Sequence, residues 1–223
     1  MGDTKACLSI SRAAGTYLVA AVDNMAAELA VNCVWTLGNL AASSPKTCEL
    51  LMSQGALAKI SYFHTNTELQ EACLYALKHF VYKLDNNLKV SDMRIIVDTL
   101  TKLHLNKESS HVLFIVSCHQ HFDEILTEAI ILILLEYFLE CMEKYLSSAT
   151  MSCELVYICR TLANTNAKIF EYILNFIVKR NASDLCKRVL SISDNTFVNH
   201  SLMWLFGNIY MTCKDDFFSI LVS

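Results

Sequence analysis

One phrase of the sequence occurs twice, far apart, and it constrains the fold more than any other feature. The segment Trp35–Asn39 (WTLGN) is matched near the other end of the chain by Trp204–Asn208 (WLFGN). In each copy the Trp and the Asn are four residues apart, which places them on the same face of a helix. A phrase that recurs in this way indicates a chain built from repeated units, and the other segments can be aligned on it.

Aromatic residues equivalent to Trp35 recur along the chain at intervals of about 40 residues. They are Tyr75, Phe114 (the weakest match), Tyr157 and Trp204, at successive intervals of 40, 39, 43 and 47 residues. This spacing is typical of armadillo and HEAT repeats, in which each unit is a small group of helices that stacks on the next unit.

Each repeat is predicted to contain a short, a medium and a long helix. Pro45 suits the first turn of a short helix at 45–53, and Gly55 breaks the chain before a medium helix at 56–63. The long helix carries the aromatic residue, and the five long helices are expected at 25–42, 67–83, 106–118, 150–163 and 197–212. Residues 166–192 read as the two preceding helices of the last repeat.

The repeats predict one array over residues 1–223 rather than separate domains. Its approximate repeats are 1–43, 44–84, 85–121, 122–165 and 166–212, followed by the start of a further repeat at 213–223. Neither end shows the polar cap that the terminal repeats of a solenoid need. Two interpretations stay open: the chain is a piece of a longer array, or a partner covers its ends.

The composition supports a helical chain and disfavours two classes of ligand. The sequence is 54% hydrophobic with five Gly and one Pro, too apolar for disorder and too poor in turn residues for a β-sandwich. The net charge of −4 and the lack of a basic run disfavour nucleic acid as a partner. The apolar run 129–135 has only seven residues, whereas a bilayer needs about 20, so a buried core helix is expected and a membrane is disfavoured.

The ten cysteines are predicted to be free thiols. They include no CxxC pair, and the opening MGDTKACLSI lacks the pattern of a secretory signal. Most fall on apolar stripes of the predicted helices, where a free Cys acts as a small hydrophobe. A reducing compartment, the cytoplasm and the nucleus, is therefore expected.

The two complete Trp/Asn pairs are suited to hold an extended peptide. An indole face offers an apolar wall and a cation–π contact to a Lys or Arg, and an Asn amide can bond a peptide backbone. Gly38 and Gly207 each cost about 1 kcal/mol in a helix interior, which suggests close approach of a neighbouring backbone. The predicted peptide-binding residues are Trp35, Asn39, Trp204 and Asn208, with Tyr75, His79 and Tyr157 as degenerate positions. The alternative for such aromatic residues is a place in the helical core.

WTLGNLA followed by SSPKTCELLMSQGAL resembles an armadillo repeat of the importin-α type. TYLVAAVDNMAAELAVNCVWTLGNLA also resembles a phrase of the transmembrane and coiled-coil domain-containing protein 6 group, which are divergent relatives of that type. The resemblance implies an all-α, right-handed superhelical solenoid of three-helix repeats that carries basic cargo peptides to the nucleus, with an importin-β-type transport factor as a further partner. The pairs at Tyr75/His79, Phe114/Cys118 and Tyr157/Thr161 depart from the family's Trp/Asn pattern.

The predicted function is thus a non-catalytic adaptor with no cofactor and no metal. The sequence has no Gly-rich phosphate loop, no GxSxG and no HExxH. His119 and His121 are two residues apart, so a helix would point them away from each other and they would make a poor metal pair. The alternative function is a structural scaffold or membrane-associated protein that has lost cargo binding and meets its partner, or lipid, through the helix at 129–146.

Overall fold

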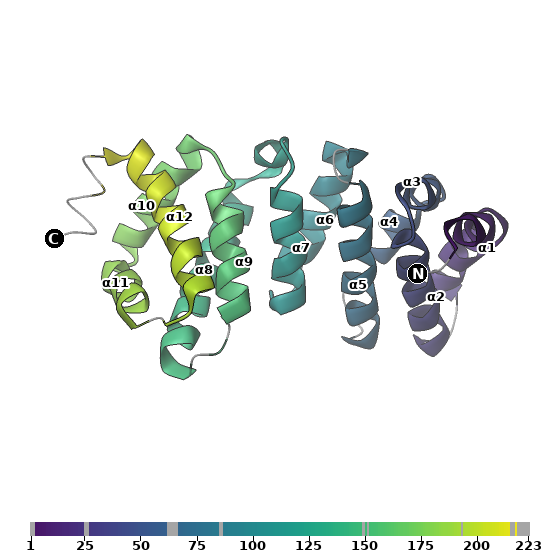
Figure 1. Ribbon diagram of the computed structural model, residues 1–223, viewed down its shortest axis with the longest axis horizontal. Coiled ribbons are helices and arrows are strands. Elements are labelled where there is room, and N and C mark those ends of the chain that lie inside the picture. Colours follow the sequence, from purple (N-terminus) through teal and green to yellow (C-terminus); the bar gives the residue numbers. More distant parts are fainter. Residues whose placement is uncertain are drawn as a thin grey trace. The chain divides into compact units, whose positions relative to one another are not determined.

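The computed structural model describes residues 3–24, 27–61, 67–84, 87–148, 150, 152–192, 194–214 and 217, and every regular element among them is a helix (Figure 1). The chain divides into two compact units, Met1–His104 and Leu105–Ser223. Each unit is described separately below as unit 1 and unit 2.

Unit 1 contains the first two long helices that the sequence predicts. Its elements are α1 (Thr4–Asn24), α2 (Ala27–Ala41), α3 (Pro45–Ser53), α4 (Ala56–Ile60), α5 (Thr67–Leu84) and α6 (Val90–Lys102). Helix α2 packs directly against α5, and α1 packs against the other side of α2 (Figure 1). The long helices predicted at 25–42 and 67–83 are therefore confirmed over their described residues.

The short helices of unit 1 begin where the local sequence predicts. Ser44 accepts a hydrogen bond from the backbone N–H of Thr47 and caps α3, whose first residue is Pro45. Gly55 has φ 85°, a left-handed conformation that glycine adopts without strain, and it separates α3 from α4. Helix α4 ends at Ile60, earlier than predicted, and residues 62 and 63 of the predicted helix lie outside the described residues.

Unit 2 contains the other three long helices, which lie side by side in the order α7, α9, α12 (Figure 1). Its elements are α7 (Lys107–Ser117), η2 (Phe122–Ile125), α8 (Glu128–Ser148), α9 (Ser152–Ala163), α10 (Ala167–Lys179), α11 (Ser183–Ile192) and α12 (Thr196–Thr212). The long helices predicted at 106–118, 150–163 and 197–212 are confirmed within two residues, as are two helices within 166–192. The further repeat predicted at 213–223 lies mostly outside the described residues.

The apolar run 129–135 belongs to α8, which is a core helix of unit 2. Leu134, Leu135 and Phe138 are buried, whereas Leu132 and Ile133 are about 40% exposed. Among the helices that the structure describes, none is both long enough and apolar enough to span a bilayer.

All ten cysteines are free thiols, and five of them are buried in the helical core. Burial raises the pKa of Cys48, Cys73, Cys141 and Cys186 to about 12, because a thiolate loses its hydration there. These thiols therefore act as core hydrophobes, as predicted. Cys118 and Cys153 are exposed instead.

Candidate functional site

The first Trp/Asn pair of the sequence is in direct contact with the next long helix. The ring centroids of Trp35 on α2 and Tyr75 on α5 are 4.3 Å apart, with the planes tilted by 43°. The Tyr75 hydroxyl donates a hydrogen bond of 2.8 Å to Oδ1 of Asn39. His79 packs edge-on against Tyr75 at 4.6 Å between centroids. The structure thus brings together four of the seven predicted site residues, with Tyr75 in the centre.

Gly38 explains how Tyr75 reaches this position. A Cβ atom on Gly38 would lie 2.9 Å from Cδ1 of Tyr75 and 3.1 Å from Cα of Ala76. Both distances are shorter than normal van der Waals contact, so only glycine lets α5 approach α2 this closely. The close approach predicted from Gly38 is therefore confirmed. The same prediction for Gly207 is wrong, because a Cβ there would meet nothing within 4 Å among the described residues.

Two lysines of α5 lie near Tyr75 and His79 in unit 1. Nζ of Lys78 lies 5.9 Å from the centre of the Tyr75 ring, within the range of a cation–π contact. Burial, followed by the charges of Lys78 and Lys83, lowers the pKa of His79. Glu71, an acidic residue near the start of the same helix, is exposed.

A second aromatic cluster lies between α7 and α9 in unit 2. His111 and Tyr157 stack with centroids 4.5 Å apart and planes within 4°, and Phe114 lies 6.0 Å from Tyr157. The guanidinium carbon of Arg160 lies 5.8 Å from the centre of the Phe114 ring. Burial is the largest cause that raises the pKa of Tyr157, which remains half-buried rather than enclosed. The predicted site residue Tyr157 therefore lies in a partly open aromatic cluster.

The second Trp/Asn pair lies on α12 and is more open than the first. Trp204 is 45% exposed and makes no ring contact with any other described residue. Nδ2 of Asn208 donates a hydrogen bond of 2.9 Å to the backbone carbonyl of Ala163, at the last residue of α9. The carbonyl oxygen of the Asn208 side chain has no partner within the described chain. This pair belongs to unit 2 and the Trp35/Asn39 pair to unit 1, so each forms a separate candidate site.

The sequence reasoning missed two cationic residues of these sites. Lys78 and Arg160 each follow the aromatic residue of their helix by three positions, where the complete phrases have Gly38 and Gly207. This signal is visible when the phrases are aligned, because Lys78 and Arg160 align with Gly38 and Gly207. His111 gives no such signal, since its contact with Tyr157 depends on how α7 and α9 pack.

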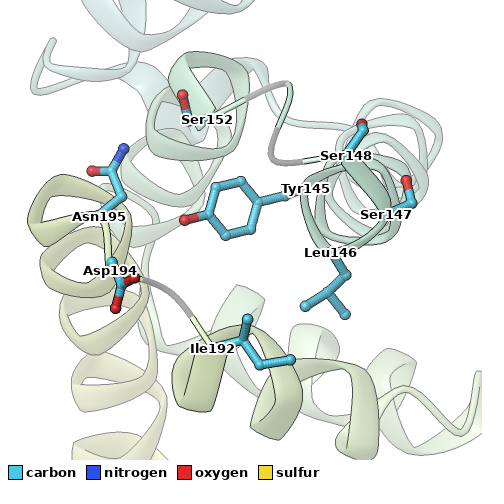
Figure 2. A pocket seen from close by; sticks show the side chains of 8 residues that line it. All are labelled: Tyr145, Leu146, Ser147, Ser148, Ser152, Ile192, Asp194 and Asn195. Carbon is cyan, nitrogen blue, oxygen red and sulfur yellow. The ribbon is translucent and has the colours of Figure 1, made fainter.

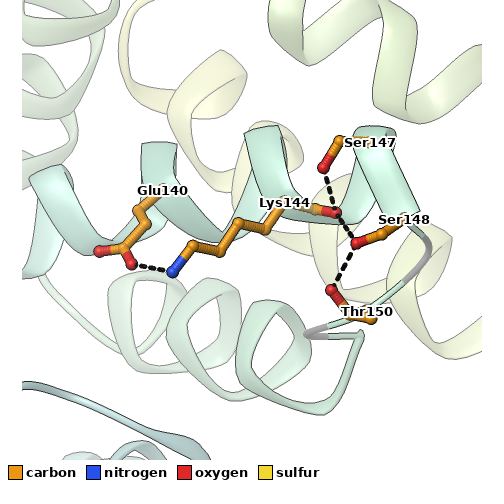
Figure 3. Close-up of polar contacts among 5 residues, drawn as sticks. All are labelled: Glu140, Lys144, Ser147, Ser148 and Thr150. Atoms are coloured by element: carbon orange, nitrogen blue, oxygen red, sulfur yellow. Dashed lines mark hydrogen bonds and ion pairs between the residues drawn. The ribbon is translucent and has the colours of Figure 1, made fainter.

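Two hollows of unit 2 lie away from Phe114, Tyr157 and Trp204. One, of about 520 Å³, lies among the ends of α8 and α11 and the starts of α9 and α12, with the side chain of Tyr145 pointing into it (Figure 2). Two of its hydroxyl groups bond the end of α8: those of Ser147 and Ser148 donate to the backbone carbonyl of Lys144. The ammonium group of Lys144 pairs with Glu140 (Figure 3). Asn195 in the same hollow caps α12. Ser147, Ser148 and Asn195 therefore stabilise helix termini.

Comparison with known proteins identifies the fold. Two designed armadillo repeat proteins each match with a TM-score of 0.67 and 15% identity over 93% of this chain and 87% of theirs, and one of them is in complex with the peptide (KR)4. An engineered protein matches with a TM-score of 0.66 and 17% identity over 95% of this chain and 85% of its own. No protein-family model and no curated protein matches the sequence. The predicted all-α armadillo repeat fold is thus confirmed, whereas the importin-α type stays a prediction.

Proposed function

We propose that this chain is a non-catalytic scaffold that binds an extended peptide across α7, α9 and α12. One observation carries the proposal. Phe114, Tyr157 and Trp204, here called the aromatic strip, are only partly buried, and they come from three neighbouring long helices. A row of partly exposed aromatic side chains of this kind provides apolar contact area for the side chains of an extended chain.

Asn208 supplies the polar part of the proposed site. Its carbonyl oxygen is available to accept a backbone N–H, while its amide is held in place by the carbonyl of Ala163. Backbone hydrogen bonds of this kind fix an extended peptide without reading its side chains. The designed armadillo protein that holds the (KR)4 peptide supports peptide binding as a use of this fold.

The test is a selection from a random peptide library displayed on phage, followed by fluorescence anisotropy with the selected peptides. Trp204→Ala is expected to weaken binding by about 30-fold, as for a central aromatic residue of an interface (about 2 kcal/mol). Asn208→Ala should weaken binding less. Tyr172→Ala is the matched control, because Tyr172 is an exposed aromatic residue on α10, outside the strip. Equal affinities for the wild type and for Trp204→Ala would refute the proposal.

A narrower candidate is an importin-α-like adaptor that binds basic localisation signals for nuclear import, together with an importin-β-type factor. The open indole of Trp204 favours it, because this face can hold the stem of a Lys or Arg. It predicts that the (KR)4 peptide binds, that added salt weakens the binding, and that a cargo with this signal enters nuclei in the presence of the protein. Absence of (KR)4 binding at low salt would exclude this candidate.

The alternative of a scaffold that has lost cargo binding is favoured only in unit 1. There Tyr75 already packs against Trp35 and occupies Oδ1 of Asn39. In a library selection, this alternative predicts a stably helical protein that enriches no peptide.

A further inference from the structure

The position three residues after the aromatic residue differs among the long helices in a way that bears on the ligand. It is Gly38 in α2, Lys78 in α5, Ser117 in α7, Arg160 in α9 and Gly207 in α12. Two of the five helices therefore place a cation where the complete phrases have glycine. Of these two cations, Arg160 is the one next to the aromatic strip, because it lies over the ring of Phe114.

Arg160 is held in a fixed orientation by the two helices on either side of α9. Its guanidinium lies over the ring of Phe114 on α7 at 5.8 Å. Its Nε donates a hydrogen bond of 3.1 Å to Oγ of Ser201 on α12. The Ser201 hydroxyl in turn donates to the backbone carbonyl of Phe197 and so is oriented to accept from Arg160. The side chain is thus positioned before any ligand binds.

Most of the hydrogen-bonding capacity of Arg160 is unused. A guanidinium has five N–H donors, and only the one on Nε has a partner within the described chain. No carboxylate of the described residues pairs with Arg160, whereas Arg180 on the same unit pairs with Glu136. Lys107 and Glu108, two charged residues of opposite sign at the start of α7, both act on the pKa of Tyr157. A half-buried guanidinium without a counter-charge favours a bidentate carboxylate.

We infer that Arg160 receives the carboxylate of an Asp or Glu side chain in the bound peptide. The peptide partner of unit 2 is accordingly an extended segment with an acidic residue between apolar or aromatic ones, and not a run of Lys and Arg. Tyr157 and Phe114 would flank the carboxylate, and Trp204 would hold a neighbouring apolar residue. This inference rests on the proposed peptide-binding function and names the ligand class for the same site.

The test uses the full chain and the library selection described above, with all individual peptides acetylated and amidated so that no terminal carboxylate is present. Peptides selected on the wild type are expected to be enriched in Asp or Glu at one position. Replacement of that residue by Gln should weaken binding by about fivefold to tenfold, as expected for a charge-assisted hydrogen bond at a partly exposed site. Replacement by Lys should weaken it further.

The variants separate the carboxylate contact from a structural role of Arg160. Arg160→Gln should abolish the difference between the Glu and Gln peptides, while binding of the Gln peptide persists and still depends on Trp204. Arg160→Lys should restore part of that difference, because it keeps the charge but not the bidentate geometry. Arg180→Gln is the matched control and should leave the difference as in the wild type.

The possible outcomes distinguish this inference from the proposed function. Selected peptides whose binding depends on Trp204 but shows no acidic preference would overturn the role of Arg160 and leave peptide binding intact. A Glu preference that survives in Arg160→Gln would overturn it as well. If no peptide is selected, both the inference and the proposed function are wrong.

Discussion

The two glycines of the recurring phrase should respond in opposite ways to the same substitution. Alanine in place of glycine in a helix interior stabilises by about 1 kcal/mol, because it restricts the unfolded chain. At Gly207 the new methyl group meets nothing within 4 Å among the residues that the structure describes. Gly207→Ala is therefore expected to raise the free energy of unfolding by about 0.5–1 kcal/mol.

At Gly38 the same methyl group would overlap its neighbours. It would lie 2.9 Å from Cδ1 of Tyr75 and 3.1 Å from Cα of Ala76. The Tyr75 ring would have to leave its contact with Trp35, and Cα of Ala76 is a backbone atom that cannot move without shifting α5. Overpacking of this kind costs about 1–3 kcal/mol. After the gain in helix propensity, Gly38→Ala should be between neutral and about 2 kcal/mol less stable than the wild type.

Urea unfolding followed by far-ultraviolet circular dichroism measures both changes. The two variants should differ by about 1–3 kcal/mol, with Gly207→Ala the more stable. Trp35 fluorescence should also change in Gly38→Ala, because the Tyr75 ring that covers the indole is displaced. If Gly38→Ala is as stable as Gly207→Ala, then the close packing of α2 on α5 does not depend on glycine and the reasoning is refuted.

Three further predictions concern individual side chains. Tyr75→Phe removes the hydrogen bond to Asn39 and should lower the free energy of unfolding by about 0.5–1 kcal/mol in the same urea assay, with no loss if that bond is not formed in solution. The pKa of His79 is lowered in the folded state, so the unfolded state binds protons more readily and the free energy of unfolding should fall as pH drops below about 6.5. NMR titration should show a higher His79 pKa in Lys78→Gln than in the wild type, because the charge of Lys78 contributes to the lowering. Iodoacetamide at neutral pH should modify the exposed Cys118 and Cys153 first, as measured by peptide mass spectrometry. The buried thiols are Cys48, Cys73, Cys141, Cys159 and Cys186, and their early modification would contradict their burial.

The sequence was sufficient to predict the helices that carry the aromatic residues, because their signals are local and periodic. Trp35 and its four equivalents located α2, α5, α7, α9 and α12, and Pro45 and Gly55 located the starts of α3 and α4, whereas α1 and α6 were not predicted. Each of these residues acts through its own helix or turn, so its effect is the same wherever the helix packs. The early end of α4 at Ile60 shows the usual uncertainty of a helix terminus.

The state of each candidate site could not be predicted, because it depends on the next helix in space. Trp35 and Trp204 belong to nearly identical phrases, yet one is covered by Tyr75 and the other is 45% exposed. Gly38 and Gly207 differ for the same reason. The phrase predicts which side chains lie on one face of a helix, whereas the cover of Trp35 comes from Tyr75, 40 positions away in sequence.

Tyr75 occupies the first Trp/Asn pair from within the same chain, as a competing ligand would. A peptide that used Trp35 and Asn39 would have to displace a ring contact worth about 0.5–1.5 kcal/mol and a hydrogen bond worth about 0.5–1 kcal/mol. The uncovered state is then a minor population, and the apparent affinity of unit 1 falls by about 5- to 70-fold relative to an identical open pair. Competition from a tethered side chain does not weaken on dilution, because its effective concentration is fixed by the fold. At low peptide concentration, unit 2 should therefore fill first, and unit 1 should respond only when peptide is abundant.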